Sequence, residues 1–250
     1  MTLLYIPKGR AREYANLAAN LYRGCAHRCQ YCFGPDVLHI KKEDFHATPS
    51  PRTNALQLLE KELQTRDPAL AGEVVLLSFT TDPYQPINQE YRLTRSAIEL
   101  LHRYGHPVCI LTKGGLRSTV DFDLFQPGDQ YATTLVFTDE HLQQRYESGA
   151  APTADRIAAL QQAHDAGIFT WVSLEPVIAP RQTIQLIRET CDFVDHYKVG
   201  TLNHNYSDSP TYIPEAASID WELFAIEVQN LLSRSKKSFY LKEDLRRWMS

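Results

Sequence analysis

Long apolar runs are absent from this 250-residue sequence: no stretch approaches the roughly 18 to 20 uncharged apolar residues that a membrane-spanning helix requires. Clusters of proline and glycine are absent too, since the 14 Pro and 11 Gly are scattered. With 43% apolar residues, the chain is too apolar for a disordered protein. Membrane-spanning, fibrous and disordered classes are therefore excluded. The first residues show only a brief apolar run before their charges, so we expect an unexported, cytoplasmic protein without a membrane partner.

An excess of positive charge is also missing. The 26 Lys and Arg stand against 30 Asp and Glu, which gives a formal net charge of -4. Capture of a polyanion normally rests on many Lys and Arg contacts to phosphates. The charge therefore gives no support for a nucleic-acid partner, although it does not exclude one.

A disulfide framework is absent as well, because the five cysteines are odd in number and unevenly spread. Three fall within eight residues, at Cys25, Cys29 and Cys32, and leave Cys109 and Cys191 isolated. Clustered thiols in a chain without an export signal indicate a metal or a metal cluster in a reducing compartment.

Short β-rich runs alternate with amphipathic stretches, a rhythm that predicts parallel βα units. We predict strands at residues 18–22, 74–79, 108–112, 131–137, 169–174 and 193–199. We predict helices at residues 53–64, 94–104, 153–166, 182–190 and 220–233, with Gly105 and Gly167 at two helix ends. Six units favour an α/β fold with an open, partial (β/α)6 TIM-like barrel, and a flat doubly wound sheet is the alternative. We assign residues 1–234 to the barrel and 235–250 to a C-terminal extension packed on the same domain.

The cysteine cluster reads CAHRCQYC, a CxxxCxxC motif that follows a predicted strand. Soft thiolates select zinc or iron-sulfur clusters. Three thiolates on one tight loop suit three irons of a 4Fe-4S cluster, whose fourth iron then has no protein ligand. Structural zinc is the alternative, but it normally needs four protein ligands. His27 is awkwardly placed for that role, and the isolated cysteines serve only if the fold brings them close.

Further segments accompany this motif along nearly the whole chain: LLSFTTDPYQPINQEYRLTR, CILTKG, TLVFTDEHL, SLEPVI, YKVGTLNHN and FYLKEDL. Together they resemble the radical S-adenosylmethionine (SAM) enzymes, in the branch related to spore photoproduct lyase. The resemblance implies a 4Fe-4S cluster on Cys25, Cys29 and Cys32, with SAM bound at the open iron. It further implies cleavage of SAM to a 5'-deoxyadenosyl radical that abstracts hydrogen from a substrate.

For the substrate class and the electron donor, the resemblance is the only guide. A nucleic acid or nucleotide comes first by analogy, and a small metabolite or peptide is nearly as well supported. An electron donor such as flavodoxin or ferredoxin is implied as a partner.

Three polar residues at strand ends match positions that the resemblance assigns to SAM binding. Lys113 ends an apolar strand, where a charge is costly unless it faces a cleft or an anion; the alternative is a surface Lys at the barrel rim. Thr81 and Asp82 stand where many radical SAM enzymes place a segment around the SAM amine. A turn before Pro83 is the structural alternative for Asp82.

Other residues resemble parts of the same site. Thr134 aligns with a Ser that helps to hold SAM in the lyase, or else is a Thr satisfied by the backbone. Tyr31 is expected to pack on the cluster, and Glu175 points into the same rim. Arg156 could reach the SAM carboxylate, yet on a helix it is more often solvated. The substrate-pocket candidates are Tyr84, Lys198, Asn203, His204 and Asn205.

One position departs from the lyase. The lyase donates a hydrogen atom from a Cys directly before its Ser-Asp pair, and Thr80 stands at the matching position here. A hydroxyl O–H bond is far too strong for that role. We therefore do not expect repair of the spore lesion.

The most basic stretch, residues 234–248, either touches a phosphate-bearing substrate or forms a solvated final strand and helix, which is the commoner use of such a run.

The rival function from another class is that of a non-catalytic zinc or iron-sulfur binding protein, for example a nucleic-acid-binding accessory protein. Bound zinc, or a cluster without an open iron, would identify that rival.

Overall fold

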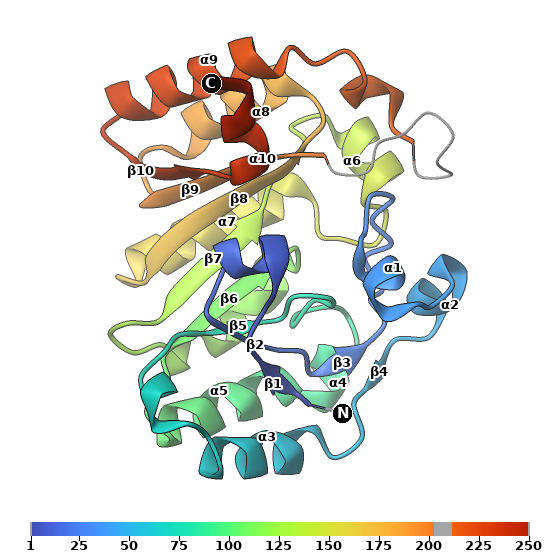
Figure 1. The fold of residues 1–250 in the computed structure, drawn as a ribbon, viewed down its shortest axis with the longest axis vertical. Coiled ribbons are helices and arrows are strands. Elements are labelled where there is room, and N and C mark those ends of the chain that lie inside the picture. The colour runs from blue at the N-terminus through green and yellow to red at the C-terminus, as the bar shows by residue number, and fades with distance from the viewer. Residues whose placement is uncertain (1, 203–211, 250) are drawn as a thin grey trace.

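One open sheet of parallel strands forms the centre of the fold. The computed structural model describes residues 2–202 and 212–249. The sheet has the strand order β1-β2-β5-β6-β7-β8-β9-β10, and only the β1–β2 pairing at its edge is antiparallel (Figure 1). Its strands are β1 (Leu4–Tyr5), β2 (Leu17–Ala19), β5 (Val75–Leu77), β6 (Val108–Thr112), β7 (Gln130–Thr134), β8 (Phe169–Val177), β9 (His196–Thr201) and β10 (Ser238–Leu241). The predicted α/β fold with an open, partial barrel is confirmed, and the six predicted strands follow one another in the sheet.

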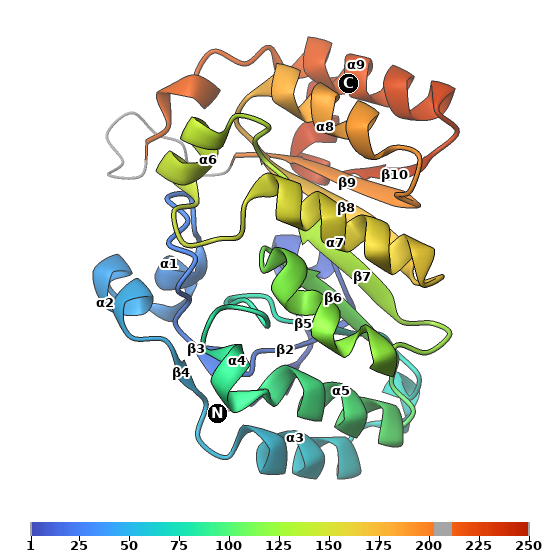
Figure 2. The ribbon, with the colours of Figure 1, turned by 180° about the vertical axis from the view of Figure 1, so that it is seen from behind.

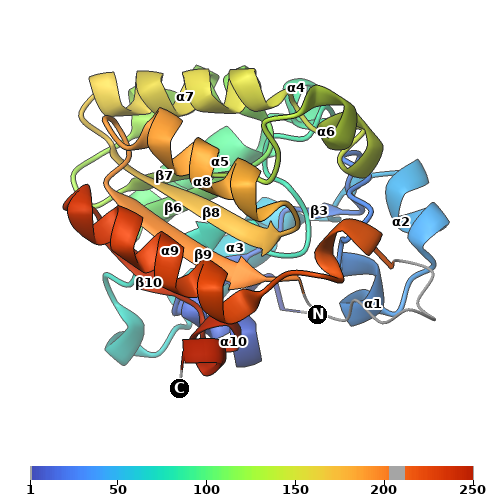
Figure 3. The ribbon, with the colours of Figure 1, turned by 90° about the horizontal axis from the view of Figure 1, so that it is seen from above.

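Five long helices cover one face of the sheet, as Figures 2 and 3 show. They are α3 (Ala55–Gln64), α5 (Leu93–Arg103), α7 (Thr153–Asp165), α8 (Pro180–Thr190) and α9 (Trp221–Arg234). All five were predicted, because apolar residues recur at helical spacing along them. Gly105 and Gly167 follow α5 and α7 with φ of +74° and +75°, the left-handed conformation that glycine adopts at helix ends.

Shorter elements complete the fold, and some of them lie at the carboxyl ends of the strands. Figure 3 shows α1 and α2 beyond the ends of β8 and β9. The short helices are α1 (Gly34–Leu38), α2 (Lys42–Ala47), α4 (Asn88–Tyr91), α6 (Glu140–Tyr146) and α10 (Glu243–Arg246). The 3-10 helices are η1 (Gly9–Glu13), η2 (Pro68–Leu70), η3 (Gly115–Leu124), η4 (Pro214–Ala216) and η5 (Arg247–Met249).

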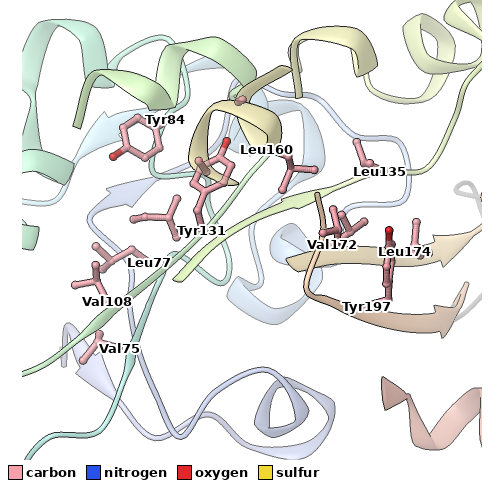
Figure 4. Close-up of a cluster of buried hydrophobic side chains, with 14 of the residues drawn as sticks. Val75, Leu77, Tyr84, Val108, Tyr131, Leu135, Leu160, Val172, Leu174 and Tyr197 are labelled. Atoms are coloured by element: carbon pink, nitrogen blue, oxygen red, sulfur yellow. The ribbon is translucent and has the colours of Figure 1, made fainter. Parts of the chain in front are cut away.

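The main core lies between the sheet and the long helices. Side chains of β5, β6, β7, β8 and β9 pack there with Leu160 of α7 (Figure 4). These strands are covered on both faces, which is why their sequences read as apolar runs without alternation. Each fully buried Val or Leu contributes about 1.5 to 3 kcal/mol relative to an exposed one.

The predicted strand at residues 18–22 is wrong as a single element. It is divided into β2 and β3 (Tyr22–Arg23), and β3 pairs with β4 (Ser50–Pro51) in a separate two-stranded sheet. Asn20 causes the division, because its side-chain oxygen accepts hydrogen bonds from the backbone N–H groups of Phe79 and Thr80, each at 2.8 Å. The chain thereby leaves the large sheet immediately before the cysteine motif.

Within residues 2–202 and 212–249, no helix combines the length and the apolar character needed to cross a membrane.

Candidate functional site

A cavity of about 350 Å³ lies at the carboxyl ends of the strands. Its walls come from the cysteine loop after β3, the ends of the parallel strands, η1 and the residue that follows β10. The cavity brings together the three clustered cysteines with every predicted SAM contact: Tyr31, Thr81, Asp82, Lys113, Thr134 and Glu175. Residues up to 150 positions apart in the sequence therefore share one space, and their roles stay predictions.

Close backbone packing shapes the cysteine loop. Gly24 has a φ of +70°, and a Cβ there would lie 2.5 Å from the carbonyl oxygen of Phe45. A Cβ on Gly34 would lie 2.8 Å from the carbonyl oxygen of Thr80. Between these glycines, the N–H of Cys25 donates to Phe45 O at 3.1 Å and that of Cys32 donates to Cys29 O at 3.2 Å. The two glycines thus permit a close approach that no side chain at either position would allow.

The thiols of this loop are protonated when no metal is bound. Cys25 and Cys29 are buried and Cys32 is half-buried. Burial raises the pKa of Cys29 to about 12, and burial also raises the pKa of Cys25 well above its ordinary value. A metal or cluster must therefore displace these protons when it binds.

The donor geometry distinguishes a cluster from a single ion. Among the described residues, no group of three or more His, Cys, Asp or Glu side chains is placed to hold one metal ion. His27 uses both ring nitrogens elsewhere, at 3.3 Å from Asp82 and 3.4 Å from Arg117. Cys109 and Cys191 do not line the cavity. The loop fits an iron-sulfur cluster, in which each thiolate binds a different iron.

Asp82 joins the cysteine loop to the ends of two strands. Its carboxylate accepts from the hydroxyl of Thr112 and the N–H of Lys113, both at 2.7 Å, and from the N–H of Tyr84 at 2.8 Å. Nδ1 of His27 lies 3.3 Å away. Burial alone would raise the pKa of Asp82, but His27 and these hydrogen bonds outweigh it and hold the pKa far below its ordinary value. The turn and the site were alternative readings of Asp82. The structure shows the turn contact to Tyr84 and places Asp82 in the cavity wall, and its role toward SAM stays a prediction.

Unpartnered polar groups face the same space. The hydroxyls of Ser78 and Thr81 are buried in the cavity wall and have no hydrogen-bond partner in the described part of the chain. Lys113 extends its Nζ over the ring of Tyr31, 5.5 Å from the ring centre. Burial lowers the pKa of Lys113, but the neighbouring Cys29 and Glu147 raise it above the ordinary value. A half-buried cation beside two unpartnered hydroxyls suits a ligand that carries a carboxylate and an amine.

The part of the cavity beside β10 contains a second polar group, which we call the β10 end: Tyr14, Glu175 and Lys242. Lys242 donates to both carboxylate oxygens of Glu175, and the hydroxyl of Tyr14 donates to the same carboxylate. The predicted final strand and helix exist as β10 and α10, but the expectation that the basic run is solvated is wrong for Lys242, whose side chain is only 2% exposed. Glu175 and Glu13 compensate this buried cation.

Arg156 was expected to be solvated, and that expectation is also wrong. Its side chain is fully buried and forms a 2.7 Å ion pair with Glu147, which is equally buried. The hydroxyl of Tyr31 donates to Glu147 as well. Sequence reasoning missed Glu147, since nothing marks a Glu in a loop as the partner of a Tyr 116 positions away.

The two substrate-pocket candidates that the structure describes, Tyr84 and Lys198, lie outside the cavity wall. Tyr84 is buried and donates to Asp121 at 3.0 Å, and Lys198 donates to the backbone oxygens of Glu13 and Tyr14. Neither lines the cavity. The other three candidates, Asn203, His204 and Asn205, lie outside the described residues.

Comparison with known proteins identifies the family. The model of the radical SAM superfamily matches residues 19–194. The chain belongs to this superfamily. Membership implies SAM and an iron-sulfur cluster, which agrees with the thiol geometry of the cavity.

Sequence comparison finds relatives that are described as uncharacterised proteins. The protein Rv2578c of Mycobacterium tuberculosis is 34% identical over 182 residues, which cover 69% of this chain and 52% of that protein. The protein MJ0683 of Methanocaldococcus jannaschii is 24% identical over 193 residues, covering 76% of this chain and 71% of that one. The chain thus spans about half the length of the mycobacterial relatives that it matches.

Solved structures share the fold. A cysteine-to-alanine variant of spore photoproduct lyase superposes with a TM-score of 0.68 and 15% identity, covering 95% of this chain and 79% of that one. SuiB of Streptococcus suis, bound to S-adenosylmethionine, superposes with a TM-score of 0.64 and 12% identity, covering 90% of this chain and 49% of that one. At these identities the likeness concerns the fold.

Proposed function

We propose that this chain is a radical SAM enzyme that binds a 4Fe-4S cluster through Cys25, Cys29 and Cys32 and takes SAM at the open iron. The observation that carries the proposal is that one cavity holds these thiols together with the half-buried Lys113 and two unpartnered hydroxyls. When bound, the cluster and SAM supply one-electron cleavage to a 5'-deoxyadenosyl radical, which abstracts hydrogen from a substrate.

The residues around the cysteines have separate tasks in this proposal. Lys113 neutralises the SAM carboxylate, and the open hydroxyls of Ser78 and Thr81 supply hydrogen bonds to its polar groups. Asp82 already accepts three hydrogen bonds, so it fixes the backbone of the Lys113 loop. Thr134 at the end of β7 lines the same wall.

Apolar side chains form part of the cavity wall beside the cysteines. Phe33, Phe79 and Leu111 line it, with the rings of Phe33 and Phe79 5.6 Å apart. Tyr31 packs beside the cysteines and is held through its hydroxyl. An apolar wall offers a carbon radical few groups with which to react in a side reaction.

The β10 end is our proposed substrate side. Glu175 was predicted to bind the cofactor, but its oxygens are taken by Lys242 and Tyr14, so we place it toward the substrate. A nucleotide or nucleic acid is the first candidate, because one solved structure of spore photoproduct lyase holds AdoMet and a dinucleoside spore photoproduct. A small metabolite or peptide is the second. Thr80 lines the cavity in place of the lyase's cysteine, so the reaction differs from lesion repair.

The proposal includes a cytoplasmic setting and an electron donor such as flavodoxin or ferredoxin. It also treats residues 1–234 as the catalytic barrel and residues 235–250 as its extension. The extension contributes Lys242 to the cavity, and β10 pairs with β9 in the sheet.

Anaerobic reconstitution tests the proposal. We expect about four irons and four sulfides per chain, and 5'-deoxyadenosine when SAM and dithionite are added. The Cys29→Ala variant should lose both the cluster and the product. Cys191→Ala is the matched control, because Cys191 is half-exposed at the end of α8 and lies outside the cavity.

The rival function predicts other results. Zinc in place of iron, or a complete cluster that leaves SAM uncleaved, would support a non-catalytic binding protein instead.

A further inference from the structure

The connection between α6 and α7 lies directly against the cysteine loop. Gln30 N donates to Tyr146 O at 2.8 Å, and Gly149 N donates to His27 O at 2.9 Å. Cys29 and Glu147 pair as an isolated antiparallel bridge. One contact thus falls between the first two cysteines of the motif and another between the last two. We call residues 146–151 the platform.

The platform also supports the Lys113 loop. Ala151 N donates to the carbonyl oxygen of Lys113 at 2.9 Å. A Cβ on Gly115 would lie 2.7 Å from the Cβ of Ala151, and Gly115 has a φ of +57°. The same short segment therefore fixes the spacing between the cysteines and Lys113.

Glu147 is the charged residue of the platform, and it is fully buried. Its carboxylate accepts a hydrogen bond from the hydroxyl of Tyr31 and forms an ion pair with Arg156 at 2.7 Å. Arg156 donates in turn to the carbonyl oxygens of Ala151 at 2.8 Å and Thr134 at 3.1 Å. The ion pair therefore connects Tyr31 of the cysteine loop to a residue of the cavity wall.

A buried charge at this position acts on the thiolates. The carboxylate of Glu147 contacts Tyr31 of the cysteine loop directly, and Arg156 lies on its other side. The remaining donors of Arg156 reach the carbonyl oxygens of Ala151 and Thr134. The negative end of the ion pair is therefore the end that touches the cysteine loop. A nearby negative charge in a poorly screened interior disfavours further negative charge, including the electron that reduces a cluster.

We propose that Glu147 is a positioning residue that lowers the reduction potential of the cluster, by placing one buried negative charge beside Cys29 and holding Tyr31. This rests on the proposed function, since it assumes that the cysteines carry a cluster. Lys113 acts in the opposite direction, so the two residues set the potential between them.

The test is a redox titration of the reconstituted protein, without SAM, followed by the spectrum of the reduced cluster. Glu147→Gln keeps the shape and the hydrogen bond to Tyr31 but removes the charge, so the midpoint potential should shift to a more positive value. Lys113→Gln should shift it to a more negative value. Glu215→Gln is the matched control, because Glu215 binds Tyr146 and Arg145 on the solvent side of the same segment. Its midpoint should equal that of the wild type.

A double variant keeps the test usable if the single variant fails to fold. Glu147→Gln leaves the buried Arg156 without its anion, so Glu147→Gln/Arg156→Gln provides a second variant with no unpaired charge. We expect a smaller positive shift, because the carboxylate of Glu147 touches the cysteine loop through Tyr31, whereas Arg156 touches the far side of that carboxylate. If a variant holds as much iron and sulfide as the wild type, a shift in its midpoint potential is electrostatic and does not reflect cluster loss.

Each result is decisive. An unchanged or more negative midpoint in Glu147→Gln, or in the double variant if the single one holds no cluster, overturns the inference while the proposed function stands. A wild-type chain that takes up no cluster contradicts the proposed function, and the inference with it.

Discussion

Lys242 donates to both carboxylate oxygens of Glu175, at 2.9 and 2.7 Å, inside the cavity that also contains the cysteines. The two residues lie 67 positions apart, one in β8 and the other directly after β10. A Cβ on Gly200 of β9 would lie 2.9 Å from Lys242 and 3.0 Å from Glu175. The strand between them therefore carries no side chain where the ion pair crosses it.

Lys242→Met should destabilise the fold, because it leaves the carboxylate of Glu175 buried without its cation. We expect the free energy of unfolding to fall by about 3 to 5 kcal/mol in urea denaturation at neutral pH. Arg247→Met removes an exposed ion pair with Glu243 and should change the free energy by less than about 1 kcal/mol. Equal losses in the two variants would show that Lys242 stabilises no more than a surface residue does.

The loss in Lys242→Met should depend on pH. Burial raises the pKa of Glu175 in the folded state, and Lys242 and Tyr14 offset only part of this rise. A carboxyl with a raised folded pKa binds its proton more tightly in the fold, so stability falls as pH rises from the unfolded pKa, about 4.3, through the folded one. Without Lys242 that pKa rises further. The variant should therefore lose less stability at pH 5 than at pH 8, and a loss independent of pH would contradict the assignment.

Asp82→Asn should loosen the strand ends beside the cysteine loop. An amide cannot accept every hydrogen bond that Thr112, Lys113 and Tyr84 donate, so we expect a loss of about 2 to 4 kcal/mol at pH 7. The folded pKa of Asp82 is depressed, so the wild-type advantage is present above the unfolded pKa of about 3.9 and shrinks as pH falls below it. Unfolding measured at pH 7 and pH 3 checks this, and a gap of constant size would count against it.

The sequence predicts the parallel sheet and the cysteine loop because both depend on local signals. Apolar runs separated by helical periodicity locate the strands, and CxxxCxxC needs only eight consecutive residues. The same patterns fail for Arg156 and Lys242, since a charge on a helix or in a basic run is normally solvated. Their partners, Glu147 and Glu175, meet them only after the chain has folded.

Gly149 has a role that its sequence context does not reveal. A Cβ there would lie 2.0 Å from the carbonyl oxygen of Ala26, in the cysteine loop. Gly149→Ala should therefore displace the loop and reduce the iron bound per chain after reconstitution. Gly167→Ala is the control: it places a side chain at a φ of +75° with no atom within 4 Å, so it lowers stability by about 1 kcal/mol yet keeps the iron. Equal iron content in both variants would show that the platform tolerates a shift.

Substitutions at the two ends of the cavity should differ in their effect on the affinity for SAM. Lys113→Met removes the cation proposed to meet the SAM carboxylate. Loss of one charge-assisted hydrogen bond, about 1.5 to 3 kcal/mol, corresponds to roughly 10- to 100-fold weaker binding. Tyr14→Phe removes only a hydroxyl at the β10 end, where it donates to Glu175, and should leave the dissociation constant within about twofold. Equilibrium dialysis of the reconstituted proteins with labelled SAM compares them directly. If Tyr14→Phe weakens SAM binding as much as Lys113→Met does, then SAM extends to the β10 end, and the substrate must approach the cysteines from another wall of the cavity.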